Sequence, residues 1–143
     1  MTADPPIEVT VRRRFPQSAE RVFDAWLDPV SARAWFFATS EGEMIKAEID
    51  PAVGGEFCFI DRRDDEDIEH FGEYVEMKRP RRLVFDFSVN QSPVSRVAID
   101  FAPLDEGCDV TLTHEMPAQF AAHAERAKHG WAAMLEGLGR TLA

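Results

Sequence analysis

The polar residue best placed to do chemistry is His114, which stands in a strand-like run near the end of the chain. This run, residues 110–114, reads Val-Thr-Leu-Thr-His, and side chains two apart in a strand share a face. His114 therefore lies on the face of Val110 and Leu112, which we expect to point inward. A histidine there could hold an oxygen atom of a ligand or transfer a proton near neutral pH. The alternative is a structural histidine, partly buried and hydrogen-bonded to the backbone near the strand end.

Two more candidates for proton chemistry, Glu73 and Tyr74, lie in an earlier strand-like run, where His70 shares one side with Tyr74 and Glu73 takes the other. Tyr74, Val75 and Met77 cannot all share one face of a strand unless the strand contains a β-bulge. Either Glu73 or Tyr74 could therefore reach inward, and an exposed position is favoured for Glu73.

Other patterns that carry chemistry are missing from the sequence. His123 and His129 fall near the polar sides of a predicted helix, and neither forms the i, i+4 histidine pair of a zinc site. The chain has no Gly-x-Ser-x-Gly elbow, no phosphate-binding glycine loop and no supported Cys–His dyad. We therefore expect no metal ion and no cofactor, and the sequence offers no convincing nucleophile for a hydrolase. Cys58 and Cys108 lack metal-ligand spacing and are expected to be reduced thiols.

The charge of the chain argues against nucleic acid as a partner. Its formal net charge is −10, whereas binding to phosphates depends on an excess of Lys and Arg. The chain has two basic clusters. The three arginines at residues 12–14 are predicted to lie on both faces of a strand, and residues 78–82 are predicted to form a solvated turn. No apolar run approaches the roughly 18 residues of a membrane span, and the N-terminus lacks a signal-peptide core. We therefore expect a cytoplasmic protein with no stable membrane insertion.

Hydrophobic periodicity divides the chain into strands and helices. Residues 1–6 are predicted to be a disordered tail, and residues 7–143 to be a single domain. Two short helices follow the first strand, with Ser18 and Asp28 as N-caps and residues 35–37 at the end of the second helix. The predicted strands cover residues 7–15, 44–49, 56–61, 71–77, 83–87, 94–101 and 109–115.

Two local predictions concern the strand region. The alternation within residues 44–49 places Ile45, Ala47 and Ile49 on one face. The acidic run 64–67 is expected to be a solvated loop, because it lacks the spaced ligands and the central glycine of a calcium-binding loop.

The longest predicted element is a C-terminal helix over residues 118–142. Gly130 and Gly137 each cost this helix about 1 kcal/mol relative to Ala, so close approach of another backbone is expected at both. The apolar residues recur every three or four positions and form one face of the helix: Phe120, Ala124, Ala127, Trp131, Met134, Leu135, Leu138 and Leu142.

These elements predict an α+β architecture, in which a curved antiparallel sheet of six to seven strands wraps around the C-terminal helix. One face of the sheet needs cover, and only this helix is long enough to provide it. Either a filled core or an apolar cavity that binds a ligand is compatible with this pattern. The residues expected to line the space are Trp35, Phe57, Phe59, Phe85, Phe87, Phe101, Trp131, Met134 and Leu135.

Five segments carry a resemblance to a known family. They read Ser-Ala-Glu-Arg-Val-Phe-Asp-Ala-Trp-Leu-Asp-Pro (18–29), Asp-Pro-Ala-Val-Gly-Gly-Glu-Phe (50–57), Pro-Arg-Arg-Leu-Val-Phe (80–85), Thr-Leu-Thr-His (111–114) and Gly-Trp-Ala-Ala-Met-Leu (130–135). With these segments in order, the chain resembles the Hsp90-ATPase-activator-homologue (AHSA1-like) family over about residues 7–142. The resemblance implies the helix-grip fold of the START/Bet v 1-like (SRPBCC) superfamily, whose members bind lipids, sterols, polyketides and other hydrophobic molecules.

Three functions are therefore considered. The first is the binding of a hydrophobic or amphipathic small molecule, with the lining residues above as apolar contacts and His114 orienting the ligand. The second is an enzyme of the cyclase or dehydratase type, which requires at least two polar groups that converge in the pocket. The third is an interaction protein, either a homodimer or a stress-linked chaperone partner. The co-chaperone activity in the family's name is associated with larger proteins that carry an additional N-terminal domain.

Overall fold

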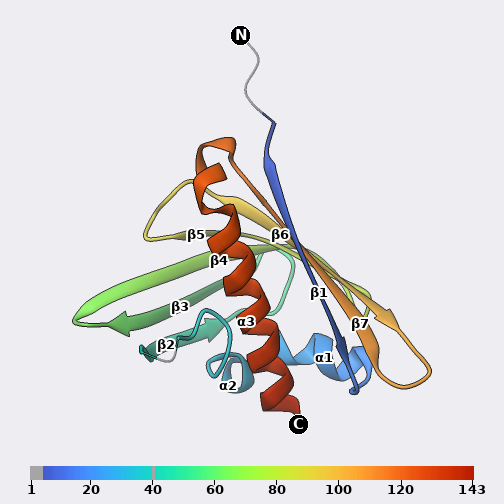
Figure 1. Cartoon of the computed structure of the whole chain (residues 1–143). Helices are drawn as coiled ribbons and strands as arrows, with labels where there is room; N and C mark the ends of the chain where they lie inside the picture. Colours follow the sequence, from blue (N-terminus) through green and yellow to red (C-terminus); the bar gives the residue numbers. More distant parts are fainter. Residues whose placement is uncertain (1–4, 40) are drawn as a thin grey trace.

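A computed structural model of the protein describes residues 5–39 and 41–143, so that most of the predicted N-terminal tail lies outside the described residues. Within this part of the chain, seven strands form one antiparallel sheet that curves around a long C-terminal helix, and two short helices follow the first strand (Figure 1). This confirms the predicted α+β helix-grip architecture. The elements are β1 (Ile7–Phe15), α1 (Ala19–Ala25), α2 (Pro29–Ala32), β2 (Glu43–Ile49), β3 (Glu56–Arg63), β4 (Glu66–Lys78), β5 (Arg82–Val89), β6 (Ser95–Pro103), β7 (Cys108–Met116), η1 (Ala118–His123) and α3 (Ala124–Leu142).

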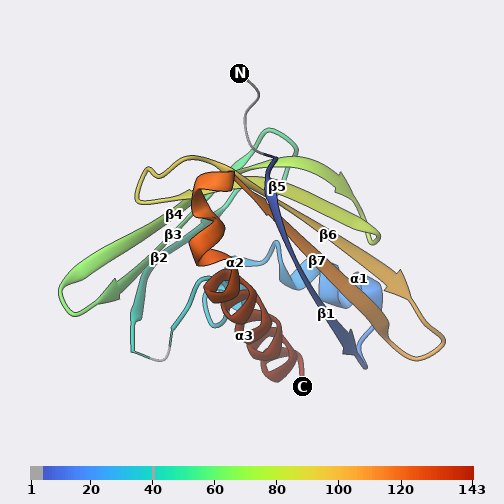
Figure 2. The same cartoon turned by 45° about the horizontal axis from the view of Figure 1, so that its top comes forward.

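The strands lie in the order β1-β7-β6-β5-β4-β3-β2, so that β1 and β2 are the two edges of the sheet. The concave face of the sheet surrounds α3, and α1 and α2 lie near the C-terminal half of that helix (Figure 2). Alternate residues of each strand face this interior, such as Val97, Ile99 and Phe101 of β6, all of which are buried. The period-2 pattern of the sequence thus builds the wall of the interior.

The two short helices begin at the predicted caps. Ser18 Oγ accepts a hydrogen bond of 3.2 Å from the N–H of Arg21, and the Asp28 carboxylate accepts one of 3.0 Å from the N–H of Val30. The Arg21 guanidinium also donates to the carbonyl of Leu142 at 3.1 Å. A cation at the end of a helix satisfies carbonyls that have no partner within the helix. The start of α1 therefore holds the end of α3.

The second helix is shorter than predicted. It covers Pro29–Ala32, and residues 33–37 continue as turns. Phe37 then takes a φ of +57°, which reverses the chain. This left-handed backbone is uncommon for an aromatic residue. Burial of Trp35, Phe36 and Phe37, which are at most 6% exposed, compensates for it.

The acidic run 64–67 is not one long loop. Strands β3 and β4 continue to a two-residue turn at Asp64 and Asp65, whose φ angles are +49° and +64°. Both strands therefore extend beyond the predicted ranges 56–61 and 71–77. Aspartate tolerates the left-handed backbone that such a tight hairpin requires, which explains the extension.

Bulges change the faces of two strands. A register shift between Met44 and Lys46 leaves Ile45 39% exposed, so the prediction that Ile45 shares a face with Ala47 and Ile49 is wrong. Met44 packs against the core together with Ala47 and Ile49 instead. A second shift between Tyr74 and Glu76 is the β-bulge that the sequence of β4 requires. Before this bulge the strand alternates regularly, so that Glu73 is exposed, as predicted, and Tyr74 is buried.

The C-terminal element is not a single α-helix over residues 118–142. It begins as the 3₁₀ helix η1 and becomes α-helical at Ala124. The predicted apolar face is confirmed, since Trp131, Leu135, Leu138 and Leu142 are buried and Phe120, Ala124, Ala127 and Met134 pack partly against the core. None of the helices among the described residues is long and apolar enough to cross a membrane.

The two glycines of α3 have different surroundings. A Cβ atom at Gly137 would lie 3.0 Å from Cβ of Trp35, so the predicted close approach occurs there. A Cβ atom at Gly130 would meet nothing within 4 Å, so the prediction is wrong at that position. Gly130 instead borders an open pocket.

Candidate functional site

Aromatic side chains fill much of the space between the sheet and α3. The ring centroids of Phe57 and Phe85 are 5.3 Å apart, and those of Phe36 and Phe59 are 5.0 Å apart. Residues that the sequence places here, and that the structure leaves at most 2% exposed, are Trp35, Phe57, Phe59, Phe85, Phe101, Trp131 and Leu135. The interior is therefore a packed layer with pockets beside it, rather than one continuous open cavity.

The first of these, which we call the large pocket, lies between residues 34–39 and α3. It has a volume of about 580 Å³, within the usual range for small-molecule sites. Its walls combine apolar groups, small residues of α3 and a few polar groups. The lining residues are Ala34, Trp35, Phe37, Ala38, Thr39, Arg63, His70, Gly130, Ala133, Met134, Gly137 and Arg140.

His70 supplies the buried polar group of the large pocket. It is 5% exposed, and its ring stacks on that of Phe37 with centroids 4.2 Å apart. Nδ1 lies 3.3 Å from the carbonyl oxygen of Phe59; because a carbonyl can only accept, Nδ1 carries the hydrogen. Burial lowers the pKa of His70 to about 4, so the ring is neutral at pH 7. Nε2 then has a lone pair that can accept a hydrogen bond.

The two arginines at the large pocket both have acidic partners. Arg63 Nε lies 2.7 Å from the carboxylate of Asp61, which is 1% exposed and also accepts a hydrogen bond of 2.9 Å from Thr39 Oγ1. Arg140 lies 3.1 Å from the carboxylate of Glu136. Because both cations are paired, the pocket does not present an uncompensated positive charge. The Asp61 contacts also fix residue 39 against β3.

The second pocket, which we call the small pocket, lies beneath η1 and the β5–β6 turn and has a volume of about 160 Å³. It shares no lining residue with the large pocket. One aromatic layer separates the two, since Phe37 of the large pocket and Phe87 of the small pocket have centroids 5.2 Å apart. The small pocket is lined by Phe87, Ser88, Val89, Ser92, Pro93, Ser95, His114, Met116, Phe120, His123 and Ala127.

His114 faces inward, as predicted, and is 6% exposed. It does not bond the backbone, as the structural alternative supposes, but two side chains. The indole N–H of Trp131 donates to Nδ1 at 2.9 Å, and Nε2 lies 2.8 Å from Ser95 Oγ. Burial lowers the pKa of His114 to about 4, which again gives a neutral ring at pH 7.

The polar candidates do not converge on one point. His70 borders the large pocket and His114 the small one, while Tyr74 packs its ring against Phe57 and Phe85 and lines neither. Burial raises the pKa of Tyr74, which keeps its hydroxyl neutral. Among the described side chains that line these two pockets, only Ser95 and His114 are hydrogen-bonded to each other.

Several residues of the two pockets carry no signal that sequence reasoning could use. Phe37 and Arg63 reach the large pocket only because a turn and a tight hairpin place them there. Ser95 stands at the start of β6, where the alternation of apolar residues has not yet begun. Of the predicted lining residues, Trp35 and Met134 border the large pocket and Phe87 and His114 the small one.

A third hollow, of about 610 Å³, runs along the outer face of β2, β3 and β4. Charged side chains such as Lys46, Glu48 and Glu69 line it together with Phe71, which is 41% exposed. It lies on the convex side of the sheet, away from α3. Its open, charged walls distinguish it from the two inner pockets.

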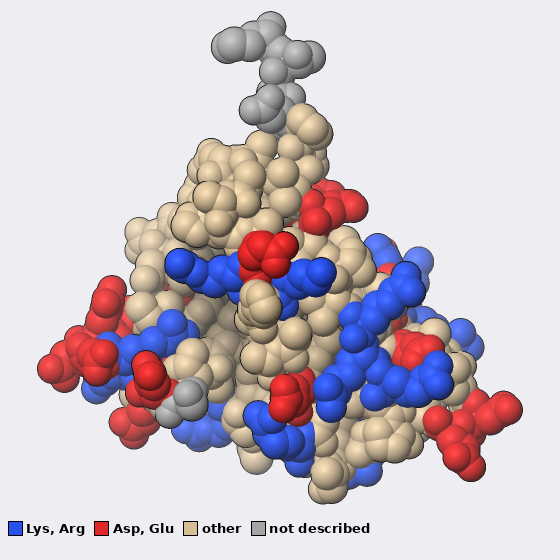
Figure 3. Space-filling view, in the orientation of Figure 1, with Lys and Arg blue, Asp and Glu red and all other residues tan. Residues whose placement is uncertain are grey.

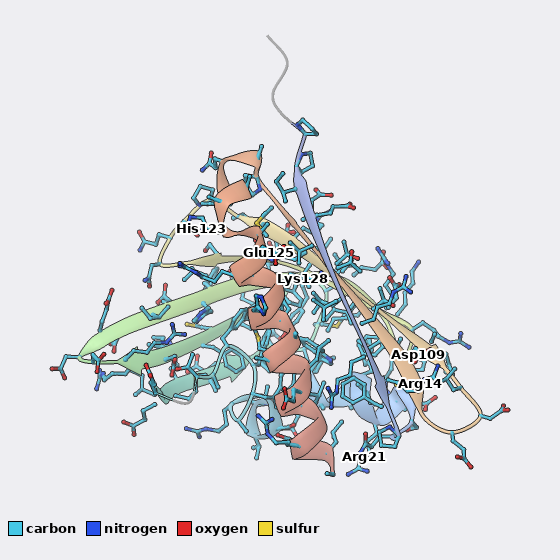
Figure 4. All side chains as sticks on the ribbon, viewed as in Figure 1. Arg14, Arg21, Asp109, His123, Glu125 and Lys128 are labelled. Carbon is cyan, nitrogen blue, oxygen red and sulfur yellow. The ribbon has the colours of Figure 1, made fainter. Side chains whose placement is uncertain are left out.

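The basic cluster at residues 12–14 divides between the two faces of β1, as predicted. The Arg13 guanidinium lies 5.8 Å from the ring centroid of Phe15, whereas Arg14 pairs with Asp109 across β1 and β7 at 2.8 Å (Figure 4). On the face that carries α3, acidic and basic side chains are interspersed (Figure 3). The arginines thus form strand contacts within a mixed surface.

Comparisons with solved structures show the same fold. A protein from Chromobacterium violaceum superposes with a TM-score of 0.83 at 24% identity, over 93% of this chain and 94% of its own. A protein of unknown function from Staphylococcus aureus gives a TM-score of 0.85 at 14% identity, over 95% and 93%. The solution structure of an AHSA1-like protein from Aeromonas hydrophila gives 0.79 at 23% identity, over 95% and 92%. A search of curated protein sequences gave no match.

The sequence itself matches a family profile. The profile of the family described as "Activator of Hsp90 ATPase homolog 1-like protein" matches residues 16–143, from the end of β1 to the C-terminus. The match covers the helices, six strands of the sheet and both pockets. The chain therefore belongs to the AHSA1-like family of the SRPBCC superfamily.

Proposed function

We propose that the protein binds a small, mostly apolar molecule in the large pocket. The observation that carries this proposal is a pocket of about 580 Å³ in which apolar walls surround one buried, neutral histidine. Ligand sites commonly combine an apolar lining with a few placed polar groups. Membership of a family with a ligand-binding fold supports the same function.

The polar groups favour a neutral ligand that carries a hydrogen-bond donor. His70 presents an acceptor at Nε2, because its Nδ1 hydrogen is used on the carbonyl of Phe59. Arg63 and Arg140 are already paired with Asp61 and Glu136, so an anionic group would have to compete with these carboxylates. A hydroxyl or N–H group facing His70, with an apolar body against Trp35 and Met134, suits this lining.

The remaining predicted residues take a supporting role in this proposal. Phe57, Phe59, Phe85, Phe101, Trp131 and Leu135 form the packed layer behind the pockets. Catalysis, a homodimer and a chaperone partner stay predictions of the sequence. A cytoplasmic location belongs to the same proposal, and the two free thiols, Cys58 and Cys108, suit a reducing compartment.

The proposal is tested by blocking the large pocket from α3. Gly130 borders the pocket and has open space at its Cβ position, so Gly130→Leu projects a side chain into it while improving the helix propensity. Ala132→Leu is the matched control, because Ala132 is exposed on the same helix and lines neither pocket. The probe is N-phenyl-1-naphthylamine, a neutral aromatic amine whose fluorescence rises in apolar sites.

We expect the wild type and the Ala132→Leu variant to bind this probe equally, and Gly130→Leu to bind it at least tenfold more weakly. The loss follows because the leucine occupies the volume that the probe needs. Equal binding by all three proteins, with unchanged unfolding transitions, would place the probe elsewhere and contradict the proposal.

A further inference from the structure

The small pocket contains a hydrogen-bonded chain whose direction is set by chemistry. The indole nitrogen of Trp131 can only donate, so Nδ1 of His114, 2.9 Å away, must accept. In a neutral imidazole the other nitrogen then carries the hydrogen. Nε2–H of His114 therefore donates to Ser95 Oγ at 2.8 Å. The chain runs in one direction, from Trp131 through His114 to Ser95.

This direction determines what Ser95 can do. Its oxygen accepts from His114, so its own O–H hydrogen is left to donate, and the hydrogen bonds among the described residues include no acceptor for it. His114 cannot remove that hydrogen, because the nitrogen that faces Ser95 is already protonated. Ser95 is thus a hydrogen-bond donor to the pocket and not an activated nucleophile. Donors in a chain of this kind are strengthened by the bonds behind them.

The rest of the small pocket complements such a donor. Ser92 Oγ accepts a hydrogen bond of 3.1 Å from the N–H of Val89, so its hydroxyl hydrogen is also available. Phe87, Met116 and Phe120 supply apolar walls. No Lys, Arg, Asp or Glu occurs among the residues that line the pocket in the described structure. A carboxylate buried there would have no Lys or Arg to pair with, which makes its burial costly.

We propose that the small pocket binds the carbonyl oxygen of a small, uncharged, mostly apolar molecule, with Ser95 as the donor. The proposal goes beyond the function assigned to the large pocket and does not rest on it, because the two pockets share no residue. The two sites also prefer opposite chemistry: His70 offers an acceptor to the large pocket, whereas Ser95 offers a donor to the small one.

The test compares two probes of similar size on the intact protein. Acetophenone carries a carbonyl group, and cumene replaces its oxygen by a methyl group. Binding is followed by the ¹H–¹⁵N NMR signals of the tryptophan indoles. Trp131 reports on the small pocket through His114, and Trp35, whose side chain borders the large pocket, reports on that site. Trp26 lines neither pocket, but its ring packs against that of Trp35 with centroids 4.7 Å apart, so its signal is read together with that of Trp35.

We expect acetophenone to shift the Trp131 indole signal and to bind about fivefold more tightly than cumene, which corresponds to one neutral hydrogen bond. Ser95→Ala should remove this preference, and Ser95→Thr, which keeps the hydroxyl, should retain it. The alanine variant leaves Nε2–H of His114 without its partner, so its folding is checked first. If this variant unfolds, the proposal is tested by comparing the two probes on the wild type and on the threonine variant.

Three results would overturn the proposal. Equal affinities of acetophenone and cumene would show that no donor acts on the carbonyl. A shift of Trp35 without one of Trp131 would place the probe in the large pocket. A threonine variant that folds but loses the preference would show that the hydroxyl of residue 95 is not the donor. Failure of the large-pocket function leaves all three measurements unaffected.

Discussion

The ring of Phe37 lies nearly parallel to the ring of His70, with centroids 4.2 Å apart and an interplanar angle of 13°. Phe37 comes from the turn after α2 and His70 from β4, so this contact joins the two sides of the large pocket. The N–H of Phe37 also lies 3.3 Å from the sulfur of Met134 on α3. Phe37 therefore links the turn, the sheet and the helix at the place where the ligand is proposed to bind.

Truncation of Phe37 should reveal both its packing and its backbone strain. Phe37→Ala removes a ring that is 6% exposed and should lower the free energy of unfolding by about 3–5 kcal/mol. Phe37→Gly should be about 0.5–1 kcal/mol more stable than Phe37→Ala, because glycine adopts a φ of +57° without strain. Urea unfolding of the three proteins measures both differences. A Phe37→Gly variant that is less stable than the Phe37→Ala variant would contradict the left-handed backbone at this residue.

Acid should weaken the fold through its two buried histidines. Burial lowers the pKa of both His70 and His114 to about 4, below the value of about 6.5 in an unfolded chain. As the pH falls from about 6.5 to about 4, the unfolded state takes up protons first, and stability is lost. Each histidine accounts for up to about 3 kcal/mol over that range, and for nothing above it.

The variant His70→Gln isolates one of these contributions. Glutamine does not titrate, so the loss of unfolding free energy between pH 7 and pH 5 should be smaller in the variant than in the wild type. Urea unfolding at both pH values measures this, and the carboxylates of the chain affect both proteins alike. Equal losses would mean that His70 is protonated as readily in the folded state as in the unfolded one.

The two glycines of α3 offer a matched pair of substitutions. Gly130→Ala adds a methyl group in open space and should raise the free energy of unfolding by about 0.5–1 kcal/mol. Gly137→Ala adds the same group 3.0 Å from Cβ of Trp35, where crowding should cancel or outweigh the helix propensity. Thermal unfolding distinguishes the two, and equal stabilisation by both would show that α3 can shift away from Trp35 without cost.

The strand faces follow directly from alternation in the sequence. The inward position of His114 is an example, because Val110 and Leu112 set its parity and no bulge interrupts β7. The caps at Ser18 and Asp28 are equally local, since a side chain there bonds a backbone N–H two or three residues away. Features that depend on neighbours in sequence could therefore be predicted.

The pockets depend on contacts between distant segments, which the sequence does not reveal. Phe37 reverses the chain because its ring gains neighbours on β4 and α3, and local propensity favours another backbone at this position. The partners of His114, Ser95 and Trp131, lie 19 and 17 residues away in sequence. The bulge at Ile45 likewise moves this residue to the other face, and the turn at Asp64 extends two strands, without any apolar pattern in the sequence that predicts either feature.

Native mass spectrometry of the protein isolated from the cells that naturally make it tests the central claim most directly. The wild type, Gly130→Leu and Ala132→Leu proteins are compared, and any bound molecule is then extracted under denaturing conditions. We predict one defined, mostly apolar molecule on the wild type and on Ala132→Leu, and none on Gly130→Leu. The same molecule retained at equal occupancy by Gly130→Leu would contradict a ligand site in the large pocket.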